Sequence, residues 1–168
     1  SKTRDPQLEL ERVIERLKPV LENPDLPKYA HNASYDNAIL HYTMGIELHG
    51  LRMDTMLAEW VIDPANRGLG LKAMAFNRLG IEMTPITDLI GKGKAQITMD
   101  RVSIQDVAPY ACADADMTLR LVEPLRAMRY IHYTAWCARQ AADGGFARLV
   151  PDWGTSAWWQ KEVADLRK

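Results

Sequence analysis

The stretch KYAHNASYD, residues 28–36, joins a candidate strand to a candidate helix and carries the first of two acidic motifs. Its first four residues are mostly apolar and are bounded by turn residues, which suits a buried strand. A helix should follow over residues 34–44, because Gly45 comes next and glycine favours the left-handed backbone that ends many helices. Three polar residues lie at the junction of strand and helix: Asn32, Tyr35 and Asp36.

A second acidic motif, YACAD, occupies residues 110–114. Tyr110 and Asp114 are spaced i, i+4 and therefore lie on one face of a helix. Carboxylates that converge from separate helices can hold Mg²⁺ or Mn²⁺, and tyrosine hydroxyls can orient a water molecule. Taken alone, each motif has a simpler explanation: the first as side chains that complement a helix N-terminus, the second as a surface pair.

Apolar periodicity and capping residues predict further helices around these motifs. Asp5-Pro6 should cap a first helix that ends near Glu22. A second short strand is expected at residues 51–53, followed by a helix that Asp54 caps. Another helix is expected over residues 71–79. The pattern is that of an α/β protein with many helices and few, short strands.

The region after residue 80 combines a loop with a long helix. Residues 83–98 contain the glycines and lysines of a flexible basic stretch. Ser103 should start the long helix, with Asp106 completing an imperfect capping box. Pro109 should kink this helix or break it into two pieces, the second ending near Gly144.

Composition narrows the classes of protein. With 168 residues and 47% hydrophobic content, one core and one domain are expected. The net charge of −1 supplies no overall basic field, so nucleic-acid binding would need local patches and metal. Cys112 and Cys137 are too few for a disulfide framework, which favours a reducing cytoplasm. No apolar run is long enough to predict a membrane span.

Together, the two acidic motifs resemble those of the 3′→5′ proofreading exonuclease domain of family A DNA polymerases, which has a ribonuclease-H-like α/β fold. The segments GKGKAQ (residues 91–96) and MDTML (residues 53–57) also resemble this family and favour it over ribonuclease-D-like exonucleases. The family's first motif, Asp-x-Glu on an opening strand, has no counterpart here. The resemblance implies a partial, N-terminally truncated and helix-dominated domain over residues 1–127.

The resemblance implies a role for each matched residue. Asp114 would ligate the first metal ion, Asp36 would hold the second largely through water, and Tyr110 would orient the attacking water. Mg²⁺ or Mn²⁺ would be the cofactor. Asn32 and Tyr35 would contact the terminal nucleotides of a single DNA strand.

Two lysines and the end of the chain complete these expectations. Lys92 and Lys94 would contact DNA phosphates, although a solvated loop is an equal alternative. Residues 128–168 do not resemble the start of a polymerase region. They form an unassigned helical, Trp-rich tail, either unrelated in origin or read out of frame after a truncation.

Two functions are compatible with these motifs. The first is a metal-dependent exonuclease that acts on DNA 3′ ends but is incompetent as this chain alone, because only Asp36 and Asp114 align with the family's acidic residues. Another polypeptide would then supply the missing strands. The second is a non-catalytic module that binds single-stranded nucleic acid or serves as a structural platform. In either case the open sheet edge predicts self-association or cover by the tail.

Overall fold

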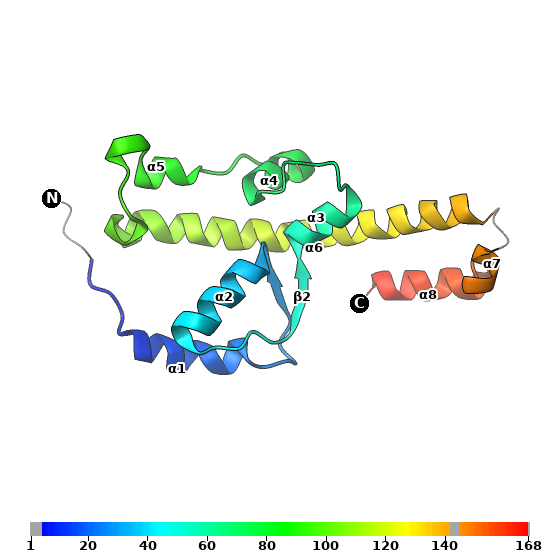
Figure 1. Cartoon of the computed structure of the whole chain (residues 1–168), viewed down its shortest axis with the longest axis horizontal. Coiled ribbons are helices and arrows are strands. Elements are labelled where there is room, and N and C mark those ends of the chain that lie inside the picture. The colour runs from blue at the N-terminus through cyan, green and yellow to red at the C-terminus, as the bar shows by residue number, and fades with distance from the viewer. Residues whose placement is uncertain (1–4, 142–144, 168) are drawn as a thin grey trace. The chain divides into compact units, whose positions relative to one another are not determined.

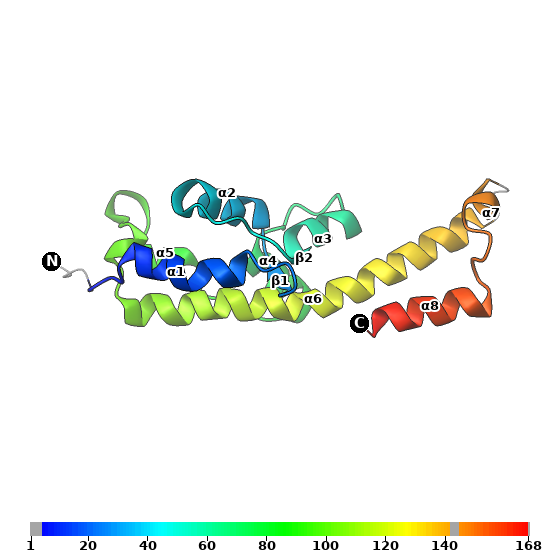
Figure 2. The ribbon, with the colours of Figure 1, turned by 90° about the horizontal axis from the view of Figure 1, so that it is seen from below.

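In the computed structural model, residues 5–141 and 145–167 are described, and they form helices with two short strands (Figures 1 and 2). The strands are β1 (Lys28–Ala30) and β2 (Leu51–Asp54). The helices are α1 (Leu10–Leu21), α2 (Ala33–Met44), α3 (Thr55–Ile62), α4 (Leu71–Leu79), α5 (Ile86–Ile90), α6 (Ile104–Gln140), α7 (Phe146–Leu149) and α8 (Ser156–Leu166). Over these ranges, no helix combines the length and the apolar character that crossing a membrane requires.

The chain divides into two compact units, Ser1–Val122 and Glu123–Lys168, and α6 contributes to both. The first unit contains both strands and both acidic motifs. Its buried apolar side chains come mainly from α4, from α6 and from the segment after α2: Ala33, Ile46, Met74, Ala75, Val102, Met117, Leu121 and Val122. These few side chains form the core that positions the site.

The two strands pair in parallel, and the connection between them contains α2. Tyr29 lies opposite Met53 and Ala30 opposite Asp54. In the described part of the chain, β1 has no strand on its other side. The expectation of a helix-dominated α/β chain with few, short strands therefore agrees with the structure.

Asp54 fastens the starts of two helices at the end of β2. Its Oδ1 atom accepts hydrogen bonds from the backbone N–H groups of Met56 and Leu57 (2.9 and 3.2 Å), which confirms the predicted cap of α3. The same carboxylate accepts hydrogen bonds from the N–H groups of Asn32 (3.1 Å) and Ala33 (2.7 Å). Since one side chain serves both helix starts, the position of α2 is fixed relative to that of α3.

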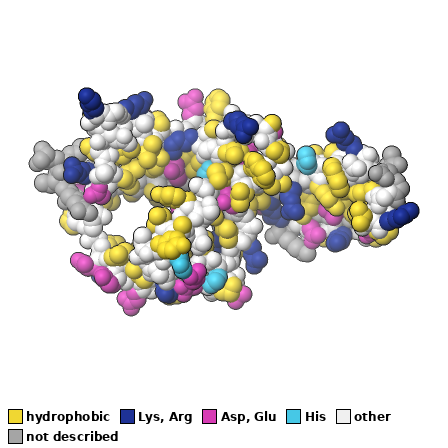
Figure 3. Space-filling model, viewed as in Figure 1, with side chains coloured by type: hydrophobic (Ala, Val, Ile, Leu, Met, Phe, Trp, Pro, Cys, Tyr) yellow, Lys and Arg dark blue, Asp and Glu magenta, His cyan; other side chains and the backbone are white. Residues whose placement is uncertain are grey.

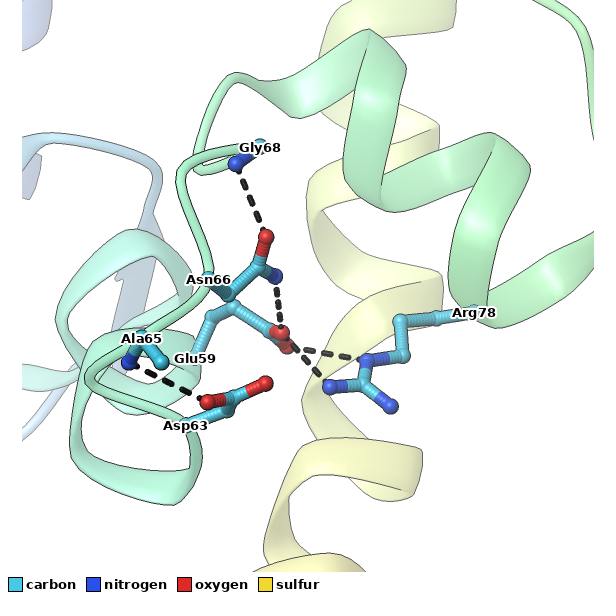
Figure 4. A network of polar contacts seen from close by, with 6 residues as sticks. All are labelled: Glu59, Asp63, Ala65, Asn66, Gly68 and Arg78. Atoms are coloured by element: carbon cyan, nitrogen blue, oxygen red, sulfur yellow. Dashed lines mark hydrogen bonds and ion pairs between the residues drawn. The ribbon is translucent and has the colours of Figure 1, made fainter.

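A buried ion pair joins α3 to α4 (Figure 4). The Glu59 carboxylate is fully buried and accepts two hydrogen bonds from Arg78, from Nε at 3.0 Å and from Nη2 at 2.6 Å. Asn66 Nδ2 donates a third at 2.7 Å, while its own Oδ1 accepts from the N–H of Gly68. The hydrogen bond from Arg78 holds the pKa of Glu59 below its ordinary value.

The start of the first helix was predicted wrongly. The helix begins at Leu10, and Glu9, rather than Asp5, is the residue before it. Asp5 Oδ2 instead accepts a hydrogen bond from the N–H of Ile104 (2.7 Å), the first residue of α6. A carboxylate can accept a hydrogen bond from the free N–H groups at the start of any helix that lies near it. For Asp5 that helix is α6, which is distant in the sequence.

The predicted break at Pro109 is also absent: α6 is one helix from Ile104 to Gln140. Proline removes a single backbone donor, and this loss near the helix start does not end the helix. The expected box at its start is present: Ser103 Oγ donates to Asp106 Oδ2 (2.6 Å) and accepts from the Asp106 N–H (3.2 Å). The predicted end near Gly144 lies outside the described residues.

The basic stretch at residues 83–98 is more ordered than a flexible loop. It contains α5 and a short 3₁₀ turn, Gly93–Ala95. Gly91, which ends α5, has φ +82°, a backbone conformation that side-chain-bearing residues rarely adopt. The N–H of Ile97 returns to the carbonyl of Ile90 (2.9 Å), and this hydrogen bond closes the segment into a compact turn.

The second unit is built around aromatic side chains. Successive ring contacts with centroids 4.7–6.3 Å apart join Tyr133, Trp136, Phe146, Trp153, Trp158 and Trp159. Phe146, Trp158 and the thiol-bearing Cys137 are buried, whereas Trp136 and Trp159 are 47% and 43% exposed. Aromatic contacts are favourable, and the tilted contact of Trp153 with Trp158 supports the packing of α8 in this unit.

Candidate nucleic-acid and metal site

The two predicted acidic residues border one cavity in the first unit. The cavity has a volume of about 540 Å³, and its lining residues come from β1, the turn after it, α2, α4 and α6: Tyr29, Ala30, His31, Asp36, Leu71, Asp114, Ala115, Thr118 and Leu119. Figure 3 shows the surface hollowed between the α1–α2 side and the N-terminal half of α6. Asp36 and Asp114 thus reach the same space from separate helices.

Asp36 lies in the first turn of α2, where the helix dipole favours a negative charge. Its carboxylate is nevertheless disfavoured, because partial burial and the nearby charge of Asp54 raise its pKa above the ordinary value. A carboxylate in such an environment gains from a cation or a proton donor that enters the cavity.

His31, which ends the predicted strand segment, also lines the cavity. Its Nδ1 lies 2.9 Å from Thr55 Oγ1, so the ring is held against the start of α3. Burial lowers the pKa of His31 despite the opposing influence of Asp54. The contact with Thr55 gives this partly buried ring a polar partner.

Asp114 has a partner that the sequence motifs did not identify. Lys72 Nζ, from the first turn of α4, lies 3.2 Å from Asp114 Oδ1 and 3.0 Å from the Tyr110 hydroxyl oxygen. The ammonium group also lies 4.4 Å from the centre of the Tyr110 ring. Burial opposes the charge of Lys72, but the hydrogen bonds to Tyr110 and Asp114 outweigh it and raise the pKa of the lysine.

Tyr110 was expected to face the cavity that Asp36 and Asp114 share. It lines instead a smaller hollow of about 160 Å³ beside α5, and Asp114 borders both spaces. The hydrogen bond from Lys72 holds the tyrosine hydroxyl on the α4 side of α6. Tyr110 and Asp114 therefore share a contact with Lys72, whereas Asp36 and Asp114 share the larger cavity.

The four predicted DNA contacts lie on the surface of the first unit. Asn32 has a left-handed backbone (φ 64°), and its Oδ1 accepts a hydrogen bond from Ser34 Oγ (3.2 Å). Tyr35 is 64% exposed on α2. Lys92 and Lys94 are exposed beside and within the 3₁₀ turn, and neither lines the cavity.

Lys72 could have been suspected from its position in the sequence. A positive charge in the first turn of a helix opposes the helix dipole, so a lysine there indicates a compensating carboxylate elsewhere. The partner itself was out of reach of sequence reasoning, because Asp114 follows 42 residues later and meets Lys72 only when α4 packs on α6.

The described residues do not fit a centre for two divalent ions. Within residues 5–141 and 145–167, no three His, Cys, Asp or Glu side chains gather as a metal site would require. Asp54, the carboxylate whose charge acts on Asp36, is engaged by four backbone N–H groups. Asp114 already faces the ammonium group of Lys72.

Comparison with known proteins relates the chain to a family. Residues 4–129 match the family model described as 3′–5′ exonuclease, of the type found in family A DNA polymerases. The chain is 43% identical over 116 residues to DNA polymerase I of Chloroflexus aurantiacus, which covers 68% of this chain and 12% of that protein.

Two further relatives agree with this match. DNA polymerase I of Pseudomonas aeruginosa is 38% identical over 120 residues, covering 71% of this chain and 13% of the relative. DNA polymerase I of Rhizobium leguminosarum is 38% identical over 117 residues, covering 70% and 11%. The chain thus spans only a small part of each relative's length. Its matched region belongs to the 3′–5′ exonuclease domain family of family A DNA polymerases.

Proposed function

We propose that the first unit is a 3′→5′ exonuclease domain of ribonuclease-H-like type that receives the 3′ end of a DNA single strand. The observation that carries this proposal is the cavity to which α2 contributes Asp36 and α6 contributes Asp114. Two carboxylates that border one cavity are part of what metal-dependent phosphodiester chemistry needs. Family membership supports the same conclusion.

The exposed groups around the cavity suit a single strand. Tyr35 is 64% exposed on α2, the helix that carries Asp36, and offers a ring on which a base can stack. Lys92 and Lys94 offer positive charge to phosphates on a chain whose net charge is only −1. Asn32, in its left-handed conformation, presents its side chain at the start of α2.

Hydrolysis by this chain alone is not part of the proposal. Mg²⁺ or Mn²⁺ would be the cofactor, but Asp36 and Asp114 are too few to hold the two ions that the chemistry needs. Further carboxylates must come from another segment or another polypeptide. The isolated chain is therefore proposed to bind a DNA end without shortening it.

The free edge of β1 is the proposed site for that further segment. β1 is hydrogen-bonded on one side by β2, and its residues Tyr29 and Ala30 line the cavity. An added strand there would complete the backbone hydrogen bonds and would end beside Asp36 and Asp114. A second copy of this chain is the alternative occupant, which light scattering on the full chain would detect.

We propose a reducing, cytoplasmic setting for this activity.

DNA binding is tested by fluorescence anisotropy with a labelled single-stranded oligonucleotide. Tyr35→Ala should weaken binding by about tenfold, since stacking on one aromatic ring contributes roughly 1–3 kcal/mol per base. Tyr42→Ala is the matched control, because Tyr42 is on the same helix and is 84% exposed. Equal effects of the two substitutions would contradict the proposed binding site.

A non-catalytic binding module is the second candidate, and the ion pair between Lys72 and Asp114 favours it. The two candidates differ when strands bearing Asp-x-Glu are fused ahead of the chain. An exonuclease gains metal-dependent shortening of a single strand, which Asp114→Ala abolishes. A binding module gains none.

A further inference from the structure

We propose that Lys72 is the resident cation of Asp114 and competes with divalent metal ions for that carboxylate. The inference rests on the proposed function, because that function makes Asp114 a metal ligand. It adds a residue to the site and a device that sets how readily the site accepts a metal ion.

The contacts of Lys72 define this role. Its Nζ donates to Asp114 Oδ1 (3.2 Å) and to the Tyr110 hydroxyl (3.0 Å), and it lies over the face of the same tyrosine ring. One ammonium group thus neutralises the acid and orients the tyrosine of the motif. These are the two groups that a metal ion and its bound water would otherwise engage.

The ion pair is built so that it can open. Among the described contacts, only Oδ1 of the Asp114 carboxylate meets Lys72, and the two side chains are 34% and 30% exposed. A lysine carries its charge on a flexible stem and makes single-point contacts, unlike the two-point contact of an arginine. The ammonium group can therefore leave without any change in the backbone of α4 or α6.

A metal ion and the ammonium group cannot share Asp114 without repulsion. Both are cations, and partial burial weakens the solvent screening between them. Binding of a metal ion must then displace Lys72 or accept this repulsion, and either cost lowers the affinity for the metal. Neutralising Lys72 should remove the cost and leave Asp114 in place.

The experiment measures Mn²⁺ binding to the full chain by the electron paramagnetic resonance signal of free Mn²⁺. Lys72→Met should bind Mn²⁺ about tenfold more tightly than wild type, the expected effect of removing one nearby positive charge at a partly screened site. Lys72→Gln should show the same gain while retaining a hydrogen-bonding group. Lys72→Arg keeps the charge and can contact Asp114 at two points, so it should show no gain over wild type.

Two controls separate competition from general electrostatics. Lys161→Met removes an exposed positive charge from α8 and should leave Mn²⁺ affinity unchanged. Asp114→Asn in the Lys72→Met background should abolish the gain. Circular dichroism establishes which variants are folded, and Lys72→Gln serves if Lys72→Met is not.

The proposal is overturned if folded Lys72→Met or Lys72→Gln binds Mn²⁺ no more tightly than wild type, including the case in which no variant binds it. It is also overturned if the gain survives Asp114→Asn or appears in Lys161→Met. These outcomes are independent of the DNA-binding result with Tyr35→Ala, so failure of this inference and failure of the proposed function are distinguishable.

Discussion

The two ends of α4 carry two cations, and each cation meets a carboxylate in a different way. Near the C-terminal end, Arg78 holds Glu59 through two nitrogens, and the carboxylate is fully buried. Near the N-terminal end, Lys72 holds Asp114 through one nitrogen, and the carboxylate borders a cavity. The same helix therefore provides one closed ion pair and one open one.

Glu59 is therefore the structural acid of this pair and Asp114 the acid that a ligand can reach. Arg78 lies where the helix dipole favours a cation, and both oxygens of Glu59 are engaged (Figure 4). Lys72 lies where the dipole disfavours a cation, and the described contact uses one oxygen of Asp114. A buried pair with complete hydrogen bonding stabilises the fold, whereas an exposed single contact contributes little stability and can be exchanged for a ligand.

The largest expected effect comes from breaking the closed pair. Glu59→Ala should lower the free energy of unfolding by about 3–5 kcal/mol, because it leaves Arg78 charged without its buried partner. Urea unfolding measures the change. Asp116→Ala is the control, since the Arg120–Asp116 pair is exposed and should cost less than about 1 kcal/mol. Similar costs for the two variants would remove the distinction between closed and open pairs.

Asp54 provides a second closed carboxylate and a smaller effect. Asp54→Ala removes the acceptor of four backbone N–H groups and should cost about 2–3 kcal/mol. Asp63→Ala is the matched control, because Asp63 accepts one exposed hydrogen bond from the N–H of Ala65. If urea unfolding gave equal losses for both, Asp54 would not fasten the starts of α2 and α3.

The closed pair also predicts a dependence on pH. The pKa of Glu59 is lowered on folding, so its contribution to stability is present above about pH 4.5, its ordinary pKa, and is lost as the pH falls through the folded-state value. Wild type should therefore lose more stability on acidification than Glu59→Gln does. Urea unfolding at a series of pH values between about 7 and 3 measures this. Parallel pH profiles would show that Glu59 is not the acid responsible.

The smallest expected effect on stability comes from Asp36, which borders the same cavity as Asp114. Folding raises the pKa of Asp36, so its carboxylate opposes folding above the ordinary pKa of 3.8, and this penalty disappears at lower pH. Asp36→Asn should raise the melting temperature by about 1–3 °C at neutral pH and have no effect below that pKa. A lower melting temperature at neutral pH would mean that the Asp36 charge stabilises the fold.

Local signals allowed much of the fold to be predicted. The cap at Asp54, the glycines Gly45 and Gly80 that end their helices, and the places of β1 and β2 along the chain all follow from neighbouring residues. Asp5 failed for the opposite reason, because its partner, the N–H of Ile104, is brought to it by packing. The break expected at Pro109 is absent because a single lost donor is a local cost that a long helix can absorb.

The candidate site divides in the same way. The motifs pointed to Asp36 and Asp114, and the structure brings both to one cavity. They could not point to Lys72, whose contact with Asp114 depends on how α4 packs on α6. Tyr110 lines the smaller hollow that Asp114 also borders, because the hydrogen bond from Lys72 holds its hydroxyl there.

We propose that Asp36 and Asp114 form part of an exonuclease site that is insufficient for hydrolysis alone. The direct test incubates a 5′-labelled DNA single strand with the purified chain and Mg²⁺ or Mn²⁺, and follows its length on a denaturing gel. The strand should remain at full length with wild type and with Asp114→Ala alike. Metal-dependent shortening by wild type that is lost in Asp114→Ala would contradict the claim, because the acids of this chain would then suffice.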